Sequence, residues 1–110
     1  MCLFCKIIDK EIPAGIVYED EKIIAFNDIA PQAPVHILLV TKEHARFVEE
    51  LADQAVVAHI YKIAEGLAKE KNIASSGYRM VVNHGRAAGQ AVDHVHFHLL
   101  GGRALFWPPG

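Results

Sequence analysis

Seven residues near the end of the chain, 94–100, read His-Val-His-Phe-His-Leu-Leu and alternate histidine with apolar side chains. Successive side chains of a β-strand point to opposite faces, so the three histidines are predicted to line one face. Imidazole is largely neutral and nucleophilic near pH 7, which suits attack on phosphorus or metal binding. Strand rise separates alternate rings by about 7 Å, so at most two can ligate one ion. At least one ring is therefore left for nucleophilic catalysis, unless the run is simply a polar-faced edge strand.

The segments around this run predict an α+β fold. Apolar runs bounded by turn residues predict strands at 16–18, 23–26, 35–40, 78–82 and 94–100. One amphipathic helix is predicted from an N-cap at Asp53 to about Asn72. Strands in meander order with one main helix imply a five-stranded antiparallel sheet that the helix covers on one face. Loops, a ligand or a partner chain must cover the other face.

Length and composition narrow the classes of function. The 110 residues fit a single domain, 1–110, and an apolar content of 52% is enough for one core. A net charge of -2 argues against nucleic-acid and membrane-surface partners. No apolar run approaches the roughly 20 residues of a membrane span, and residues 1–6 do not resemble a secretory signal. With two cysteines only three positions apart, we expect a cytoplasmic protein without a disulfide framework.

Several segments resemble the histidine triad (HIT) family, whose signature is His-φ-His-φ-His-φ-φ with φ apolar. The similar segments are 4–8, 12–13, 26–29, 31–36, 77–83, 94–100 and 101–103. The terminal Trp-Pro-Pro-Gly of residues 107–110 is similar to the Hint branch, the nucleoside phosphoramidases, rather than to the dinucleoside polyphosphate hydrolases. The resemblance implies a HIT-like fold and a two-fold homodimer whose sheets join into ten strands.

The resemblance also implies roles for individual residues. His96 would attack the α-phosphorus of a purine nucleoside 5′-phosphoramidate, and water would hydrolyse the resulting nucleotidyl-histidine. His98 would contact the phosphate and His36 would steady the rings from behind. Asp28 would accept hydrogen bonds from the ribose hydroxyls, and Asn83 would lie on the phosphate side.

A nucleotide such as AMP or GMP needs two further sets of contacts. Backbone N–H groups in the glycine-containing loop 83–91 are plausible phosphate donors; they belong to Gly89, Gln90 and Ala91. The purine would lie in an apolar slot formed by Leu3, Phe4, Ile7, Phe26, Ile29 and Leu38. Ala91 departs from the Hint branch, which commonly has serine there, and removes a hydroxyl donor near the leaving group.

Cys2 and Cys5 form a C-x-x-C pair, which by itself is often incidental. Other histidine triad proteins and the related galactose-1-phosphate uridylyltransferases combine such a pair with two histidines, and the matching positions here are His44 and His94. The resemblance therefore implies a structural zinc with four N/S ligands, and no organic cofactor. The three rings would then have separate roles, with His94 as a metal ligand, His96 as the nucleophile and His98 as a phosphate contact.

Three functions stay open at this point. The first is a purine nucleoside phosphoramidase. The second is a hydrolase of dinucleoside polyphosphates or nucleotidyl-sulfates. The third is a non-catalytic nucleotide-binding module that acts through protein partners, an alternative that Ala91 keeps open. The remaining helix histidine, His59, is expected to be merely solvated.

Overall fold

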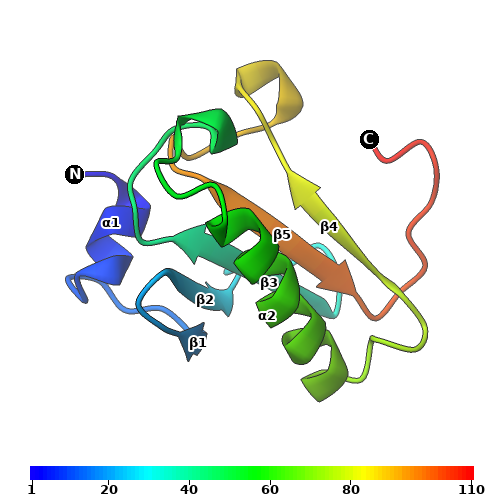
Figure 1. Cartoon of the computed structure of the whole chain (residues 1–110). Coiled ribbons are helices and arrows are strands. Elements are labelled where there is room, and N and C mark those ends of the chain that lie inside the picture. The colour runs from blue at the N-terminus through cyan, green and yellow to red at the C-terminus, as the bar shows by residue number, and fades with distance from the viewer.

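A computed structural model describes all 110 residues, and one antiparallel sheet forms its centre (Figure 1). The strands are β1 (Ile16–Glu19), β2 (Ile23–Asn27), β3 (Val35–Thr41), β4 (Tyr78–Val82) and β5 (His96–Gly101). Their spatial order is β1-β2-β3-β5-β4, with every neighbouring pair antiparallel. The predicted α+β class, with five antiparallel strands and one main helix, is confirmed.

The predicted meander order is wrong at one point, because β5 lies between β3 and β4. Phe97 and Leu99 of β5 are buried on one face of the sheet and His96 on the other. A strand buried on both faces belongs in the interior of a sheet, where both of its edges are also hydrogen-bonded. β4 is the edge strand on this side of the sheet, and the side chains of its residues Tyr78 and Val82 are exposed.

The helix α2 (Val56–Glu70) covers one face of the sheet. Its buried side chains are Val56, Ile60, Ala64, Leu67 and Ala68, and they share one core with inward residues of the strands, among them Ile37, Leu39, Phe97 and Leu99. The predicted N-cap at Asp53 is wrong, since the N-cap position is Ala55. The Asp53 carboxylate instead pairs with Lys22 at 3.2 Å.

A short helix, α1 (Leu3–Ile8), covers part of the opposite face. Phe4 and Ile7 form a second, smaller core there with Ile24, Phe26, Leu38 and Val40. The Cys2 side chain caps α1 by accepting a hydrogen bond from the backbone N–H of Cys5. Two single 3₁₀ turns, η1 (Val48–Glu50) and η2 (Arg86–Ala88), complete the elements, and none of the helices has the length and hydropathy to cross a membrane.

The expectation that His59 is merely solvated is wrong. Its Nε2 atom lies 2.6 Å from a carboxylate oxygen of Asp20. The same oxygen accepts a hydrogen bond of 2.7 Å from the Tyr18 hydroxyl, and the other carboxylate oxygen accepts two backbone N–H bonds within the turn between β1 and β2. His59 therefore ties α2 to that turn, on the face of the sheet away from α1.

Candidate functional site

The ladder of β5 begins at His96, two residues later than predicted, so His94 lies just before the strand. Both rings are on the α1 side of the sheet, where the Phe4 ring packs edge-on at 6.0 Å from His94 and 5.0 Å from His96. The centroids of the His96 and His98 rings are 5.2 Å apart, closer than the roughly 7 Å of strand rise alone, because the rings lean together.

The backbone fixes which nitrogen of His96 carries hydrogen. Nδ1 lies 2.7 Å from the carbonyl oxygen of His94. A carbonyl oxygen only accepts, so Nδ1 must donate, and Nε2 of the neutral ring keeps its lone pair. Burial lowers the pKa of His96, which favours this neutral form. His96 therefore presents a nucleophilic nitrogen at the cavity that it lines.

A second chain of hydrogen bonds orients His98. The backbone N–H of Gln32 donates to Nδ1 of His36 at 3.0 Å, so the hydrogen of the neutral His36 ring is on Nε2. His36 Nε2 then donates to His98 Nδ1 at 2.9 Å. With Nδ1 accepting, the hydrogen of His98 is on Nε2, and His98 offers an N–H donor to the cavity.

These rings are held neutral near pH 7. Burial, with the positive charges that His96 and His36 would carry, lowers the pKa of His98 to about 4. Burial also lowers the pKa of His36, although the Asp28 carboxylate lies 3.4 Å from its Nε2 and opposes the shift. At neutral pH the site therefore contains an unprotonated imidazole nitrogen of His96 next to the uncharged N–H donor of His98.

The cavity has a volume of about 370 Å³, within the range of small-molecule sites. Many of the residues predicted to bind nucleotide line it: Leu3, Phe4, Ile7, Phe26, Asp28, Ile29, Leu38, Gly89, Ala91, His96 and His98. The sequence reasoning missed Ile12, Pro13, Ala14, Asn27 and Val92. The turn after α1 enters the wall only through tertiary folding, whereas Asn27 and Val92 adjoin predicted residues.

Asp28 directly follows β2 and lines the cavity next to the histidines. One carboxylate oxygen accepts a hydrogen bond of 2.8 Å from the backbone N–H of Ala30, and the other faces His36. The carboxylate is therefore oriented from both sides while part of it stays exposed. A carboxylate in this setting can accept hydrogen bonds from hydroxyl groups of a ligand.

Three predicted residues do not line the cavity. His36 lies behind His98, and Asn83, which follows β4, is only partly buried. Gln90 is buried, and its side-chain amide accepts from Gly85 N–H and donates to two backbone carbonyls. One of these carbonyls belongs to Arg46, so Gln90 braces the loop 83–91 against the segment that follows β3.

Two of the three predicted phosphate donors form hydrogen bonds within the loop 83–91 itself. The backbone N–H of Gly89 donates to the Arg86 carbonyl, and that of Gln90 donates to the Gly85 carbonyl. Both are therefore occupied by internal hydrogen bonds in this conformation. The backbone N–H of Ala91 has no acceptor within the chain and remains available to a ligand.

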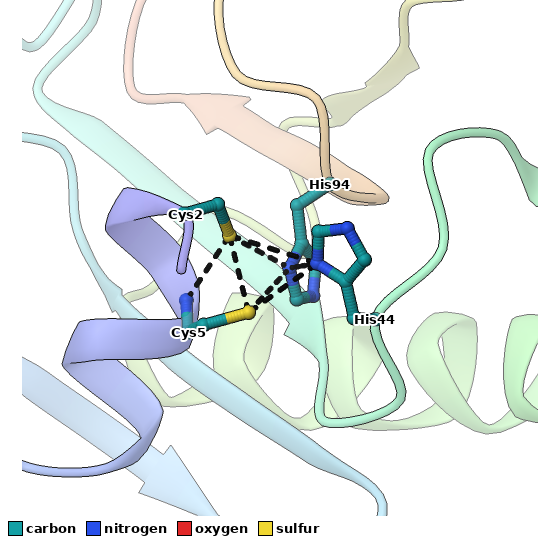
Figure 2. Close-up of side chains that lie close together, drawn as sticks. All are labelled: Cys2, Cys5, His44 and His94. Carbon is teal, nitrogen blue, oxygen red and sulfur yellow. Dashed lines mark hydrogen bonds between the residues drawn. The ribbon is translucent and has the colours of Figure 1, made fainter.

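Four side chains from three distant segments converge at the start of α1 (Figure 2). The atoms Cys2 Sγ, Cys5 Sγ, His44 Nδ1 and His94 Nδ1 all lie within 4.8 Å of one another. The two sulfurs are 3.2 Å apart and the two nitrogens 3.0 Å apart. Two thiols and two imidazoles are the donor set of a structural zinc site.

The tautomer of His94 fits this ligand set. Its Nε2 atom lies 2.7 Å from the carbonyl oxygen of Thr41, which can only accept. The hydrogen is therefore on Nε2, and the unprotonated Nδ1 faces the sulfurs of Cys2 and Cys5 at 3.3 and 3.7 Å. Metal-bound histidines in proteins usually have this second hydrogen bond on the opposite nitrogen.

A second cluster, Asp28, His36 and His98, has ligand-type atoms equally close together. Here the backbone has the opposite effect. Because Gln32 N–H donates to His36 Nδ1, the hydrogen of His36 is on Nε2, the atom that would have to bind the ion. This cluster is therefore built as a chain of hydrogen bonds rather than as a metal site.

The lowered pKa of His98 predicts acid-sensitive stability. The folded protein resists protonation of His98 down to about pH 4, whereas the unfolded chain takes up that proton near its ordinary pKa of 6.5. Between these values the unfolded state binds more protons, so the unfolding free energy falls as pH falls, by up to about 1.4 kcal/mol per pH unit. Urea unfolding at several pH values should show a shallower fall in His98→Asn. Parallel profiles for the two proteins would contradict the assignment.

Comparisons with known proteins agree with this geometry. The HIT domain family matches residues 9–105. An uncharacterized HIT-like protein of Synechococcus elongatus is 51% identical over 110 residues, which cover 98% of this chain and 96% of that protein. The crystal structure of a HIT family hydrolase from Legionella pneumophila has 46% identity and a TM-score of 0.94 over 100% of both chains. A histidine triad nucleotide-binding protein from Candida albicans has 34% identity and a TM-score of 0.80 over 98% of this chain and 83% of its own. The chain belongs to the HIT domain family.

Proposed function

We propose that this protein is a purine nucleoside phosphoramidase of the Hint branch. The observation that carries the proposal is the pairing of His96, whose Nε2 lone pair is fixed by a backbone carbonyl, with the N–H donor of His98. Both line a mostly apolar cavity that ends at a carboxylate, Asp28. The names of two relatives, a hydrolase and a nucleotide-binding protein, support the same class of function.

The cavity divides into three parts that match the three parts of a purine nucleotide. Phe4, Phe26 and Leu38 offer an apolar slot for the base of AMP or GMP. The Asp28 carboxylate would accept hydrogen bonds from the ribose hydroxyls. The phosphate would then lie at His96 and His98, within reach of the free backbone N–H of Ala91. Because these three side chains have no hydrogen-bonding group that could distinguish the edges of the two bases, adenine and guanine would both be accepted.

In the first step, the Nε2 lone pair of His96 forms a bond to the α-phosphorus. The phosphorus–nitrogen bond to the leaving amine breaks, and the amine departs with that electron pair and takes up a proton from solvent. His98 Nε2–H donates to a phosphate oxygen, on which negative charge grows in the transition state. In the second step, water attacks phosphorus and loses a proton, and His96 leaves as the neutral imidazole.

Ala91 is expected to slow the departure of the leaving amine. Ala91 lines the cavity at a position where the Hint branch commonly has a serine. No side-chain donor from this position then helps the leaving amine. We therefore propose the same chemistry with a lower rate of amine departure.

The test of the proposed function is the hydrolysis of adenosine 5′-phosphoramidate. The parent protein is expected to release AMP, and His96→Ala is expected to lose at least about 10³-fold in kcat because the nucleophile is absent. His59→Gln, a histidine substitution on the opposite face, is the matched control and should retain activity. Equal rates for the parent and His96→Ala would refute the nucleophile. Faster turnover of a dinucleoside polyphosphate or of adenosine 5′-phosphosulfate would favour the rival hydrolase function, and AMP binding without turnover would favour the binding module.

We also propose that Cys2, Cys5, His44 and His94 hold a structural zinc ion. Four protein ligands close the coordination sphere, so the ion would stabilise the fold and not take part in the chemistry. It would fix α1, which carries the cavity residue Phe4, to His94, which precedes β5 by two residues. The carbonyl that orients His96 belongs to His94, so the ion would also steady the nucleophile.

Metal analysis tests this site directly. Protein purified with zinc present is expected to contain about one zinc per chain. His44→Ala should lose most of the metal and unfold at a lower temperature, because one of the four ligands is gone. His84→Ala, which removes an exposed histidine outside the cluster, should keep both the zinc and the unfolding temperature of the parent. Parent protein without zinc, or equal zinc in both variants, would contradict the assignment.

Finally, we propose that the protein is a homodimer joined along β4. This edge strand exposes Tyr78 and Val82. Beside it, a hydrogen bond from Arg79 to the Phe106 carbonyl holds the C-terminal segment, in which the side chains of Phe106 and Trp107 are 76% and 82% exposed. Antiparallel pairing of two β4 strands would give a ten-stranded sheet and cover these apolar groups.

Sedimentation at micromolar concentration tests the dimer. The parent is expected to sediment as a dimer, and Val82→Glu as a monomer, since it places like charges across the joined edge. Ile16→Glu changes an exposed apolar residue on the other edge strand, β1, and should leave the dimer intact. A monomeric parent would contradict the proposal.

A further inference from the structure

We propose that Arg103 is a positioning residue for His98 and acts through the backbone of Gln32 and the ring of His36. The inference rests on the proposed function only in taking His98 as a phosphate contact. Arg103 is exposed, does not line the cavity and pairs with no carboxylate in the structure. Its influence on the site would run entirely through hydrogen bonds.

The first link is between the guanidinium group and the loop 29–34. Arg103 Nε donates to the Gln32 carbonyl at 2.9 Å, and its Nη1 atom donates to the Ala104 carbonyl at 2.9 Å. The guanidinium is thus fixed at two points. Because Arg103 follows the end of β5, it anchors Gln32 to the rigid part of the sheet.

The loop has few other restraints. None of the backbone groups of residues 29–34 takes part in a backbone–backbone hydrogen bond, and Pro31 and Pro34 have no N–H to donate. The Asp28 carboxylate holds Ala30 N–H, and the Gln32 side-chain amide donates to the Ala30 carbonyl at 2.9 Å. Pro34 packs closely on the turn after β5 at Gly102. At Gln32 itself, the backbone contacts are the Arg103 bond to its carbonyl and the bond from its N–H to His36.

The second link, from Gln32 to His36, determines which atom donates in each hydrogen bond between Gln32, His36 and His98. Gln32 N–H donates to His36 Nδ1, and this places hydrogen on His36 Nε2. If Gln32 moves away, His36 Nδ1 is free to carry the hydrogen, and only the Asp28 carboxylate, 3.4 Å from Nε2, still favours hydrogen on that nitrogen. In the molecules with hydrogen on Nδ1, His36 Nε2 becomes an acceptor and His98 Nδ1 must donate, so the nitrogen that His98 turns to the cavity loses its hydrogen. A donor to phosphate is replaced by a lone pair that repels phosphate.

The direct test is the tautomer of both rings, measured from imidazole nitrogen chemical shifts in ¹⁵N NMR of the zinc-loaded protein without nucleotide. Protonated and unprotonated ring nitrogens give well-separated signals. In Arg103→Ala, the signals of His36 and His98 are expected to shift toward the opposite tautomers or toward a mixture. kcat is expected to fall about tenfold with little change in KM, a smaller loss than the roughly 10²–10³-fold that follows removal of a transition-state donor itself.

Matched variants separate this effect from loss of charge or of a surface contact. Arg79→Ala removes an arginine that also donates to a backbone carbonyl, that of Phe106, and should leave the His36 and His98 signals unchanged. Arg103→Lys keeps the cation but lacks Nε, so it should show the same shift as Arg103→Ala.

Unchanged ring signals in Arg103→Ala would overturn the proposal, even if its activity fell. Wild-type signals in Arg103→Lys would overturn it as well, because charge and not the Nε bond would then be sufficient. The NMR measurement needs no substrate. A parent protein without phosphoramidase activity would therefore refute the proposed function and leave this test intact.

Discussion

A neutral imidazole has one donor and one acceptor nitrogen, and in this protein the backbone decides which is which. The bond from His96 Nδ1 to the His94 carbonyl is the contact on which the site depends, because it leaves the other nitrogen of His96 free to react. His94, to which this carbonyl belongs, is itself fixed by hydrogen bonding. Its ring donates from Nε2 to the carbonyl of Thr41, at the end of β3, and its Nδ1 atom faces two cysteines. The candidate nucleophile and the candidate metal site are thus parts of one hydrogen-bonded unit.

The fold explains why this unit is rigid. β5 is bonded to β3 on one side and to β4 on the other, and its apolar residues are buried under α2. On the opposite face the Phe4 ring packs against His96 and comes from α1, which begins at the cysteine cluster. The helix that forms one wall of the cavity is therefore positioned by the same residues that would bind zinc.

Sequence periodicity predicted the part of the site that depends on local geometry. Alternation at period two assigned His96 and His98 to one face and Phe97 to the other, and the structure has this arrangement. The ligand cluster needed more than local pattern, because His44 is 42 residues from Cys2, and the resemblance to a known family supplied the pairing. The insertion of β5 between β3 and β4 followed from burial, and an assumption of sequential strands could not give it.

The least predictable features are those in which a side chain meets a backbone group far away in the sequence. Nothing in the residue type of Gln32 or Arg103 indicates that one orients a histidine and the other restrains the loop. The two clusters of potential ligands show why this matters. At His94 a carbonyl leaves the inward nitrogen unprotonated, and at His36 an N–H group forces the inward nitrogen to carry hydrogen. Similar residue types at similar separations are thereby suited to different tasks, the proposed metal binding in one cluster and the proposed donation toward phosphate in the other. What distinguishes them is a single backbone group beside each ring, which becomes visible only once the chain is folded.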